Sequence, residues 1–572
     1  MSIYDKASLV LIPSGTKTSK VYSQKPVNGD GDFTFSRSTA ATRVNADGNI
    51  EKQTGNYILY SQQIDNSYWN KYSMSVTANQ AAAPDGTTTA DLIDDGTGTG
   101  THAIEENETI GYGGAVTISI HAKYVDTQYL VLAVYDTSYK VVVFDIQNGT
   151  IGNKSLSSLI ATIEDLGSGW YRCAVTHPTN TRNNPFYAFG LRDDNVAALY
   201  TSAGSNRQAY VWGAQMEDGL VARDYIETTT AAVEGGITDN VPRLDYTDSS
   251  CPALLLEPQR TNICPNSEDV SNWYLTFATA TPNDTISPEG VQNAAKIVTS
   301  NSGCDVKLTS IPVSPSTTYT ATFYCKLTSG SGLQTRFYDN TNGANIEYYD
   351  YSSQLVVGEW KRVTRTFTTP AGCNNIQIWF LAASSSASVT AHYWGYQLEE
   401  GSYATSYIPT YGTSVTRNEE IFKTQDIQTN GLITPTAWTL FFNCNVTLDT
   451  QNQYRDLFAI YGSKSFRVET RVNGQIRSQQ SGMVVSGDNF NAQTIGTTSN
   501  TKFAITFTPS QVKIYVDGAL VGTYNGVYEH DFNVLNVRNS NTLGAEVQLK
   551  YKKAMLFPTA LTEQEAIDLT TI

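Results

Sequence analysis

The sequence is poor in charge, histidine and cysteine, and each shortage argues against a class of protein. Charged residues make up 16% of the 572 residues, below the usual share of about 25%, which argues against a helical protein rich in ion pairs. The five His and seven Cys show no HExxH, no CxxC and no metal-ligand spacing. We therefore expect reduced, buried cysteines.

Long apolar runs and positive charge are also scarce. No run reaches the roughly 18 apolar residues of a membrane span. Leu9–Ile12 is too short for the apolar part of a secretory signal, so we expect synthesis in the cytoplasm and no membrane insertion. Lys and Arg number 38 against 54 Asp and Glu, a net charge of −16. Such a surface repels phosphate, and we expect no nucleic-acid partner.

Uncharged polar residues and aromatics take the place of charge. The chain has 35 Tyr and 20 Phe, and its length suits three or four domains. Runs such as Val116–Ala122 and Tyr319–Cys325 alternate with period two, and Gly, Asn, Asp and Pro clusters separate them. The sequence therefore predicts an all-β fold of two-sheet sandwiches.

An internal repeat organises the chain. Each copy begins with an Asn-to-Ser segment, continues through a Pro-acidic-Gly turn, and ends in Trp-Gly-x-Gln-x-Glu followed by Tyr-Ile. The matched positions are Asn56–Ser61 and Asn262–Ser267, Trp69 and Trp273, Pro84–Gly86 and Pro288–Gly290, Trp170 and Trp360, Trp212–Gly219 and Trp394–Gly401, and Tyr225–Ile226 and Tyr407–Ile408. Six of the eight Trp fall in these pairs, and we expect them to lie in sandwich cores.

These motifs resemble jelly-roll modules similar to carbohydrate-binding modules, which occur in phage structural proteins and glycan-active enzymes. The resemblance covers about 56–229 and 261–417. It implies tandem jelly rolls, module 1 at 56–229 and module 2 at 261–420. Related jelly rolls often hold a structural Ca²⁺ through oxygen ligands, but no EF-hand loop occurs here and we expect no cofactor.

The block 421–572 has a different pattern. Strands are expected at Ala437–Phe442 and Val512–Val516, the second ending in an Asp517-Gly518 hairpin turn. A short helix follows Thr562, with Glu565 completing a capping box. The combination resembles the concanavalin-A-like or laminin-G-like, lectin-like sandwich.

Segments outside the modules resemble a signature of phage head-fibre and tail-fibre proteins. Its parts are Asp32–Asn45, Asp47–Glu51, Val241–Tyr246 and Leu254–Asn262. The resemblance implies that the N-terminal segment, 1–55, attaches to other virion proteins. Because module 1 separates the two halves of the signature, we expect the linker 230–260 to pack with 30–55.

The search for catalytic motifs favours no enzyme. The recurring carboxylates Glu217-Asp218 and Glu399-Glu400 are interpreted as structural, because a catalytic pair is not expected in both copies. Sugar binding needs aromatic faces beside hydrogen-bonding groups, and unpaired aromatics are the better candidates. These candidate ligand-binding residues are Tyr348, Tyr349, Tyr351 and Trp379 in module 2, and Tyr135 and Tyr139 in module 1.

The sequence thus predicts a structural fibre or spike on a phage virion surface, on head or tail, that presents glycan- or receptor-binding sandwiches for host adhesion. A homotrimer or homodimer would add avidity to weak sites. Two alternatives stay open. One is a glycan-degrading depolymerase or the accessory chain of a glycosidase, and the other is a purely structural decoration or connector.

Overall fold

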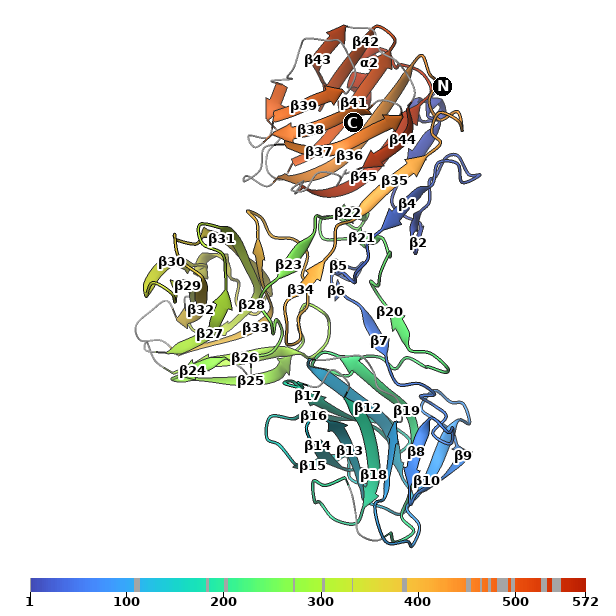
Figure 1. Ribbon diagram of the computed structural model, residues 1–572, viewed down its shortest axis with the longest axis vertical. Coiled ribbons are helices and arrows are strands. Elements are labelled where there is room, and N and C mark those ends of the chain that lie inside the picture. Colours follow the sequence, from blue (N-terminus) through green and yellow to red (C-terminus); the bar gives the residue numbers. More distant parts are fainter. Residues whose placement is uncertain are drawn as a thin grey trace.

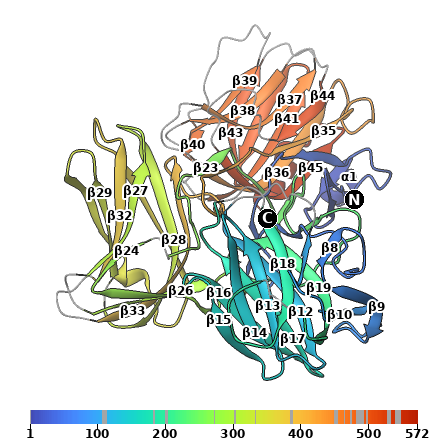
Figure 2. The same ribbon diagram turned by 60° about the horizontal axis from the view of Figure 1, so that its bottom comes forward.

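The computed structural model is built from β-sheets, as the alternating runs predict, and it forms three lobes. Figure 1 shows the C-terminal lobe at the top, module 2 at the left and module 1 at the bottom, and Figure 2 shows the same lobes from a turned view. The structure describes residues 2–571 except 107–113, 182–184, 200–203, 271–272, 301–303, 332, 383–387, 449–453, 463–464, 472–474, 481–491, 495–498, 526–531 and 538–546. Among the described residues, no helix has the length and hydropathy needed to cross a membrane.

Module 1 is a sandwich of two six-stranded sheets. One sheet runs in the order β16 (Ile160–Gly167), β17 (Trp170–His177), β12 (Val116–Tyr124), β19 (Gln208–Asp218), β10 (Ala90–Asp94) and β9 (Ser75–Ala81). The other runs in the order β15 (Thr150–Lys154), β14 (Tyr139–Asp145), β13 (Tyr129–Tyr135), β18 (Phe186–Arg192), β11 (Ala103–Glu106) and β8 (Trp69–Tyr72). Alternate residues of both sheets, such as Ile118 and Leu132, fill the core between them.

Module 2 repeats this architecture with two five-stranded sheets. One sheet runs in the order β31 (Lys361–Thr368), β28 (Thr318–Ser329), β33 (Val389–Glu400), β26 (Ala294–Thr299) and β25 (Ala278–Thr285). The other runs in the order β24 (Tyr274–Thr276), β27 (Asp305–Pro312), β32 (Asn375–Ala382), β29 (Leu333–Asp339) and β30 (Ala344–Asp350), and is followed by the 3-10 helix η1 (Ser352–Gln354). Strands β16 and β15 of module 1 occupy sheet edges and account for its extra strand in each sheet.

The C-terminal sandwich includes strands from three parts of the chain. Its eight-stranded sheet contains β21 (Arg243–Asp245), β22 (Ala253–Leu256), β45 (Val547–Phe557), β36 (Trp438–Leu448), β41 (Ser499–Thr508), β42 (Gln511–Val516) and β43 (Ala519–Asn525), with β1 (Leu9–Leu11) also paired to β45. Its nine-stranded sheet contains β2 (Thr16–Lys17), β3 (Lys20–Val21), β4 (Phe33–Ser36), β35 (Ile421–Gln425), β44 (Phe532–Val537), β37 (Tyr454–Gly462), β38 (Ser465–Arg471), β39 (Gln475–Gln480) and β40 (Ala492–Thr494).

The N-terminal strand is therefore part of this sandwich. Leu9, Val10 and Leu11 are at most 1% exposed, and β1 pairs with Ala554–Leu556 of β45. Helix α1 (Ile3–Lys6) precedes it, and Lys6 forms an ion pair with Glu565. The apolar side chains of this strand are consequently buried against the protein's own C-terminal part.

Two local predictions for the C-terminal block are confirmed. Asp517 and Gly518 have φ values of 45° and 84°, and they join β42 to β43 as an antiparallel hairpin. Helix α2 spans Glu563–Thr571. The Thr562 backbone N–H donates to Glu565 Oε2 over 2.9 Å, while the Glu565 N–H donates to Thr562 Oγ1 over 3.3 Å, which is the capping box.

Three short two-stranded sheets lie between the lobes. They pair β5 (Arg43–Val44) with β6 (Ile50–Glu51), β7 (Thr54–Asn56) with β20 (Val233–Gly235), and β23 (Arg260–Asn262) with β34 (Val415–Arg417). Residues 30–55 and 230–262 lie together here. The Arg37 N–H donates to Asn240 Oδ1 over 3.0 Å, and the Tyr246 N–H donates to the Val44 carbonyl over 3.0 Å. We call residues 37–52, 237–262 and 402–420 the hub.

The paired tryptophans occupy two different environments. Trp69 and Trp273 lie between the sheets, in the cores of module 1 and module 2. The other two pairs lie on the outer face of the sheet that contains β12 in module 1 and β28 in module 2. The prediction that they lie in the sandwich cores was therefore wrong. Trp170 and Trp212 form one outer cluster, and Trp394 forms the other, against which Trp360 packs.

A β-bulge accounts for the outward direction of Trp212 and Trp394. In the pairing of β12 with β19 the register shifts between Ser119 and His121, at Gly213, whose φ is 63°. A glycine is suited to this conformation, and the bulge lets Trp212 point outward while Ala214 returns to the core. Gly395, with a φ of 68°, occupies the matched position in module 2.

Candidate functional site

The outer face of the β24-β27-β32-β29-β30 sheet of module 2 carries the most suggestive group of side chains. Strand β29 shows the alternation that creates this face, because Leu333 and Phe337 are buried in the core while Arg336 and Tyr338 remain partly exposed. In β32, Ile378 is buried and Trp379 is partly exposed. Period-two alternation therefore sends aromatic and cationic residues outward together.

Strand register aligns five of these residues across the whole sheet. Tyr274 pairs with Lys307, Lys307 with Trp379, Trp379 with Arg336, and Arg336 with Tyr348. Aromatic and cationic side chains thus alternate from one edge strand to the other. We call Tyr274, Lys307, Trp379, Arg336 and Tyr348 the aromatic–cationic row.

Within the row each cation lies over neighbouring rings. Lys307 Nζ is 4.0 Å from the ring centroid of Trp379 and 4.5 Å from that of Tyr274. Arg336 Cζ is 4.5 Å from the Trp379 centroid and 5.5 Å from that of Tyr348. Such cation–π contacts hold the flexible Lys and Arg side chains in place. The row is therefore largely organised before any ligand arrives.

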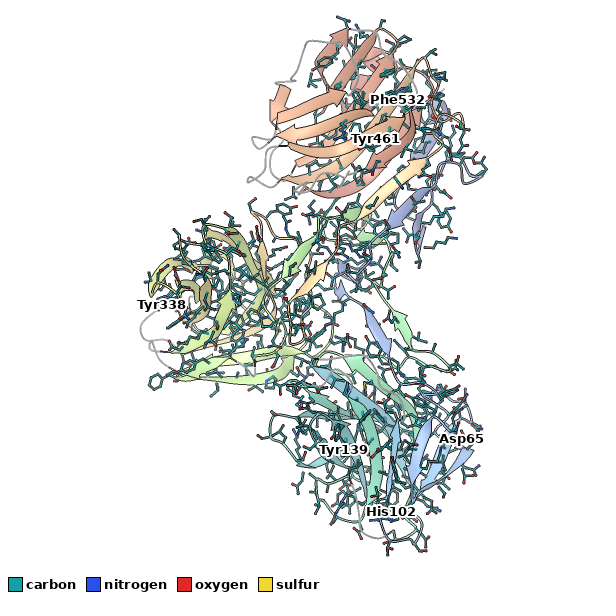
Figure 3. All side chains as sticks on the ribbon, in the orientation of Figure 1. Asp65, His102, Tyr139, Tyr338, Tyr461 and Phe532 are labelled. Atoms are coloured by element: carbon teal, nitrogen blue, oxygen red, sulfur yellow. The ribbon has the colours of Figure 1, made fainter. Side chains whose placement is uncertain are left out.

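Polar groups accompany the row on the same face. Trp379 Nε1 donates to Gln377 Oε1 over 2.9 Å, and Arg336 Nε donates to Asn345 Oδ1 over 2.5 Å. Tyr338 lies beside Trp379, with ring centroids 6.2 Å apart, and Figure 3 shows Tyr338 on the outer side of module 2. Aromatic surface with nearby amide groups is the arrangement that sugar binding requires.

Of the predicted module 2 residues, two belong to the row and two do not. Tyr348 is 51% exposed and Trp379 is at the centre of the row. Tyr351 is 0% exposed, with its hydroxyl 3.2 Å from that of Tyr393, and burial raises its pKa far above the ordinary value. Tyr351 therefore needs correction, because a ring without exposed surface cannot stack on a ligand. Tyr349 packs against the core, with Arg365 Cζ 4.8 Å from its ring centroid.

The sequence interpretation missed Tyr274, Lys307 and Arg336. Tyr274 is 52% exposed and lies directly after Trp273 of the repeat. Because adjacent residues of a strand point to opposite faces, a core position for Trp273 would have predicted an outward position for Tyr274. Lys307 and Arg336 could be recognised as site residues only once the neighbouring strands were known. Their alignment with Trp379 depends on pairings between strands far apart in the sequence.

The two predicted residues of module 1 lie next to each other. The Tyr135 and Tyr139 rings are 4.9 Å apart in a T-shaped contact, and the Tyr139 hydroxyl donates to Glu105 Oε1 over 2.8 Å. Tyr139 begins β14 of the sheet that runs from β8 to β15, and Figure 3 labels it within module 1. Small apolar residues cover much of this face, and Leu199 packs on it. These apolar residues are at most 2% exposed, so the face has two Tyr beside a buried apolar cluster, in place of an aromatic–cationic row.

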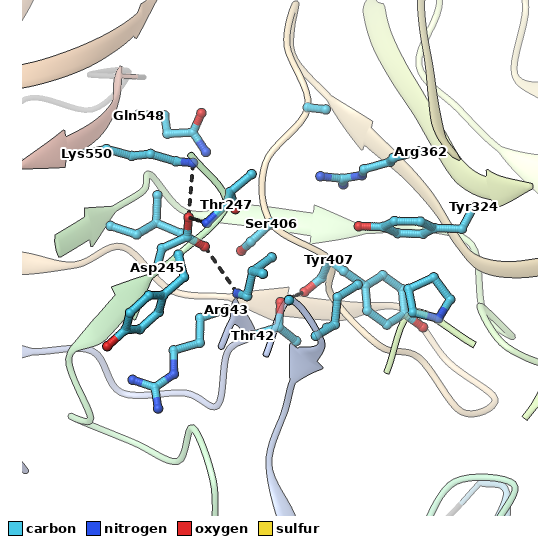
Figure 4. Close-up of a pocket in the computed structure, with 17 residues that line it drawn as sticks. Thr42, Arg43, Asp245, Thr247, Tyr324, Arg362, Ser406, Tyr407, Gln548 and Lys550 are labelled. Atoms are coloured by element: carbon cyan, nitrogen blue, oxygen red, sulfur yellow. Dashed lines mark hydrogen bonds and ion pairs between the residues drawn. The ribbon is translucent and has the colours of Figure 1, made fainter. Parts of the chain in front are cut away.

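A cavity lined by charged and apolar residues lies where the hub meets module 2 and the C-terminal sandwich (Figure 4). Its volume is about 510 Å³, and Asp245, Tyr324, Arg362 and Lys550 are among its lining residues. Lys550 Nζ is 3.0 Å from Asp245 Oδ1, and the Val44 N–H donates to Asp245 Oδ2 over 3.2 Å. Much of its charge is thus paired internally, and none of the predicted site residues lines it.

Beside this cavity the hub contains a buried ion network of Arg37, Arg243, Arg417, Glu257 and Glu420, which we call the hub network. Arg243 Nη1 is 2.8 Å from Glu257 Oε2, and its Nε donates to Glu420 Oε1 over 2.7 Å. Arg37 Nη1 is 2.8 Å from Glu420 and Arg417 Nη1 is 2.9 Å from Glu257. Burial raises the pKa of Glu257, but Arg417 and Arg243 outweigh burial and hold it well below the ordinary value.

The hub network includes charged residues from the segments that resemble the fibre signature. Arg37, Arg243 and Glu257 all belong to those segments, and their side chains are 0% exposed. The network reaches Ser406 of module 2, whose hydroxyl donates to Glu257 Oε2 over 2.6 Å. It also reaches Gln548 of the C-terminal sandwich. The signature residues therefore join parts of the chain that are distant in sequence.

Of the recurring carboxylates, Glu217 and Glu399 are buried, and each accepts a matched set of hydrogen bonds that we call a clasp. In module 1, Gln215 Nε2 donates to Glu217 Oε1 over 2.8 Å, and in module 2, Gln397 Nε2 donates to Glu399 Oε1 over 2.8 Å. Backbone N–H groups of Arg223 and Thr405 also donate to these carboxylates. A structural role explains why the two Glu occur in both copies.

Asn56 and Asn262 extend the same clasps. Each amide Nδ2 donates to two backbone carbonyls, and each Oδ1 accepts two backbone N–H groups. Each therefore satisfies buried main-chain groups at the point where its module begins. The N-terminal Asn of the repeat is explained by this geometry.

Metal and thiol chemistry have little support in the part of the chain that the structure describes. Within it no three His, Cys, Asp or Glu side chains gather as metal ligands. All seven cysteines are free thiols, and Cys251 alone is exposed.

Fold and site together define a class: a multi-lobed β-sandwich protein whose second module carries an ordered aromatic–cationic face. Residues 266–387, within module 2, match the carbohydrate binding domain family. No curated protein matches the chain.

Several solved structures share parts of the fold. The carbohydrate-binding module of a Ruminococcus gnavus IT-sialidase is 12% identical, covers 24% of this chain and 84% of its own, and has a TM-score of 0.20. A tandem carbohydrate-binding module pair from Paenibacillus barcinonensis Xyn10C is 11% identical, covers 60% and 96%, and has a TM-score of 0.20. The tripod from the baseplate of bacteriophage Tuc2009 is 15% identical, covers 53% and 98%, and has a TM-score of 0.17. At these values the likenesses support no inference about ligand or assembly.

Proposed function

We propose that this protein is a non-enzymatic adhesion fibre or spike on the surface of a phage virion, and that module 2 binds a host-surface glycan on the aromatic–cationic row. The observation that carries the glycan-binding part is the row itself, which crosses all five strands of one sheet. All five strands of this sheet lie within the residues that match the carbohydrate binding domain family.

The virion part of the proposal rests on the fibre signature. Three of its charged residues, Arg37, Arg243 and Glu257, belong to the hub network, so the resemblance includes side chains that hold the lobes together. Attachment to other virion proteins would use exposed parts of the N-terminal segment, where Val27 is 94% exposed, because the β1 side chains are buried. Assembly as a homotrimer or homodimer would add avidity to weak sites.

The non-enzymatic part rests on the clasps. Glu217 and Glu399 are 2% and 0% exposed, and each accepts hydrogen bonds from its own module. Buried carboxylates that accept such hydrogen bonds stabilise the folded module. The C-terminal sandwich, which resembles lectin-like domains, is proposed as a second presenting surface.

Glycan-array binding by the full-length chain tests the proposal. Tyr274→Ala and Tyr348→Ala each remove a half-exposed ring from the row, and we expect affinity for the bound glycans to fall about fivefold to tenfold. Tyr72→Ala is the matched control, since Tyr72 is 43% exposed on β8, which has the place in module 1 that β24 has in module 2. Its binding should be unchanged.

Two results would contradict this function. One is an array on which the full chain binds no glycan, which would favour a connector. The other is release of reducing ends from a polysaccharide incubated with the protein, which would favour an enzyme.

A further inference from the structure

The two cations of the row have few negative partners of their own. Lys307 Nζ is 3.5 Å from Asp305 Oδ2 at the beginning of β27. Among the described residues no carboxylate forms an ion pair with Arg336, whose Nε donates to the neutral amide of Asn345. Both side chains remain partly exposed. The row therefore presents positive charge on a protein whose net charge is −16.

The spacing of the row suits an extended ligand with a two-unit repeat. Neighbouring strands lie about 4.8 Å apart, so rings on every second strand recur at about 9.5 Å. This interval is comparable with the length of a disaccharide unit. The cations recur at the same interval, displaced by one strand from the rings.

We propose that the row selects an acidic glycan, in which carboxylate or sulfate groups bind Lys307 and Arg336 while neighbouring sugar rings contact Trp379, Tyr274 and Tyr348. This inference rests on the proposed function of the same face. Charge-assisted hydrogen bonds to a carboxylate are stronger than those to a hydroxyl group, so the two cations distinguish an acidic chain from a neutral one. The aromatic rings contribute contact area to both.

Module 1 shows that the charge is not a general property of the fold. The corresponding line across its β8-β11-β18-β13-β14 strands consists of Asn70, Glu105, Ala188, Ala133 and Val141. It contains no cation, and its one charged residue is acidic. Glu105 is 9% exposed and Ala188, Ala133 and Val141 are at most 2% exposed, so this line offers a glycan little surface and no positive charge. Selection for acidic glycans is therefore assigned to module 2 alone.

The acidity of the whole chain does not prevent this selection. At physiological ionic strength charges are screened beyond about 8 Å, whereas the groups that would meet on the row are in contact. Binding should nevertheless weaken as salt is added, because the ligand and the cations are partly exposed.

The test compares each acidic polysaccharide with its own uncharged form. The full-length protein is titrated calorimetrically with alginate, hyaluronate and polygalacturonate, and with each polymer after methyl esterification of its carboxylates. We expect at least one acidic polymer to bind about tenfold more tightly than its ester. The double variant Lys307→Gln, Arg336→Gln should lose this preference.

A matched variant controls for overall charge. Lys361→Gln removes a positive charge from an exposed residue on the opposite sheet of module 2, and it should keep the preference. The inference is overturned if wild-type protein binds each ester as tightly as the acid, or if the double variant still prefers the acid. Equal binding of acid and ester that Tyr274→Ala weakens would leave the glycan-binding function intact. Absence of binding to all six polymers and to the glycan array would overturn both.

Discussion

Module 1 and module 2 share the hydrogen bonds that close each sandwich, and they differ on the outer face of the sheet that carries the aromatic–cationic row in module 2. Ser61 and Ser267 illustrate the shared part, because each hydroxyl is 2.6 Å from the hydroxyl of the matched Tyr225 or Tyr407. The outer face carries Ala188 in module 1 where module 2 carries Trp379. Ala188 is 0% exposed, under Leu199. After duplication the closing residues therefore stayed constant, while the residues of this outer face diverged.

The modules also differ at a sheet edge. Strand β17 of module 1 is covered by β16, whereas the matched strand β31 of module 2 is an edge. Val175 of β17 is 0% exposed in the core of module 1. The matched residue of β31 in module 2 is Arg365, which forms a partly exposed ion pair with Glu347. A charged residue on an uncovered edge opposes pairing with another chain.

The strongest way to separate the two modules is to break the hub network. Arg243→Ala leaves Glu257 and Glu420 as buried charges with fewer partners, and we expect the free energy of unfolding of the hub and module 2 to fall by about 3–5 kcal/mol. Hydrogen exchange followed by mass spectrometry would show faster exchange there, with module 1 little changed.

The matched control for that variant is Arg365→Ala. It removes a partly exposed ion pair, which typically contributes at most about 1 kcal/mol. Equal exchange profiles for the two variants would show that the buried network does not stabilise the junction.

A smaller effect tests what the modules share. Asn56→Ala and Asn262→Ala each leave several buried main-chain groups unsatisfied, and each should destabilise its own module by about 2–3 kcal/mol. Exchange measured separately over 56–229 and 261–417 would report the two losses. A large cost in one module and none in the other would contradict the equivalence of the clasps.

The smallest effect concerns pH, because His121 of module 1 is matched by Tyr324 of module 2. Burial, with the nearby Arg172, lowers the pKa of His121 to about 4. An unfolded His binds a proton below about 6.5, and the folded one does not until about pH 4. Acidification from pH 7 to 5 should therefore remove about 2 kcal/mol of module 1 stability through this residue.

The swap variants measure this contribution. His177 acts with the same sign because burial lowers its pKa, while Asp91 opposes both because burial raises its pKa to about 6. His121→Tyr should reduce the loss of module 1 stability between pH 7 and 5, and Tyr324→His should introduce a loss in module 2. Melting midpoints at the two pH values provide the measurement, and unchanged pH dependence in both variants would contradict it.

Local patterns predicted much of this molecule. Alternation and turn residues predicted the all-β sandwiches, and Asp517-Gly518 and Thr562 predicted a hairpin and a helix start that the structure contains. Prediction failed where side-chain direction mattered. Tyr351 and the outward Trp212 were misplaced because one bulge or one register step moves a side chain to the opposite face.

The sequence by itself determined the repeated sandwich and its turns, because period-two alternation and the conformations of Gly and Asn act over a few residues. Only the tertiary structure decided which distant strands became neighbours. The alignment of Lys307, Trp379 and Arg336, the burial of β1 in the C-terminal sandwich, and the hub network all depend on such pairings. Each is a relation between residues that the chain brings together only when its cores close.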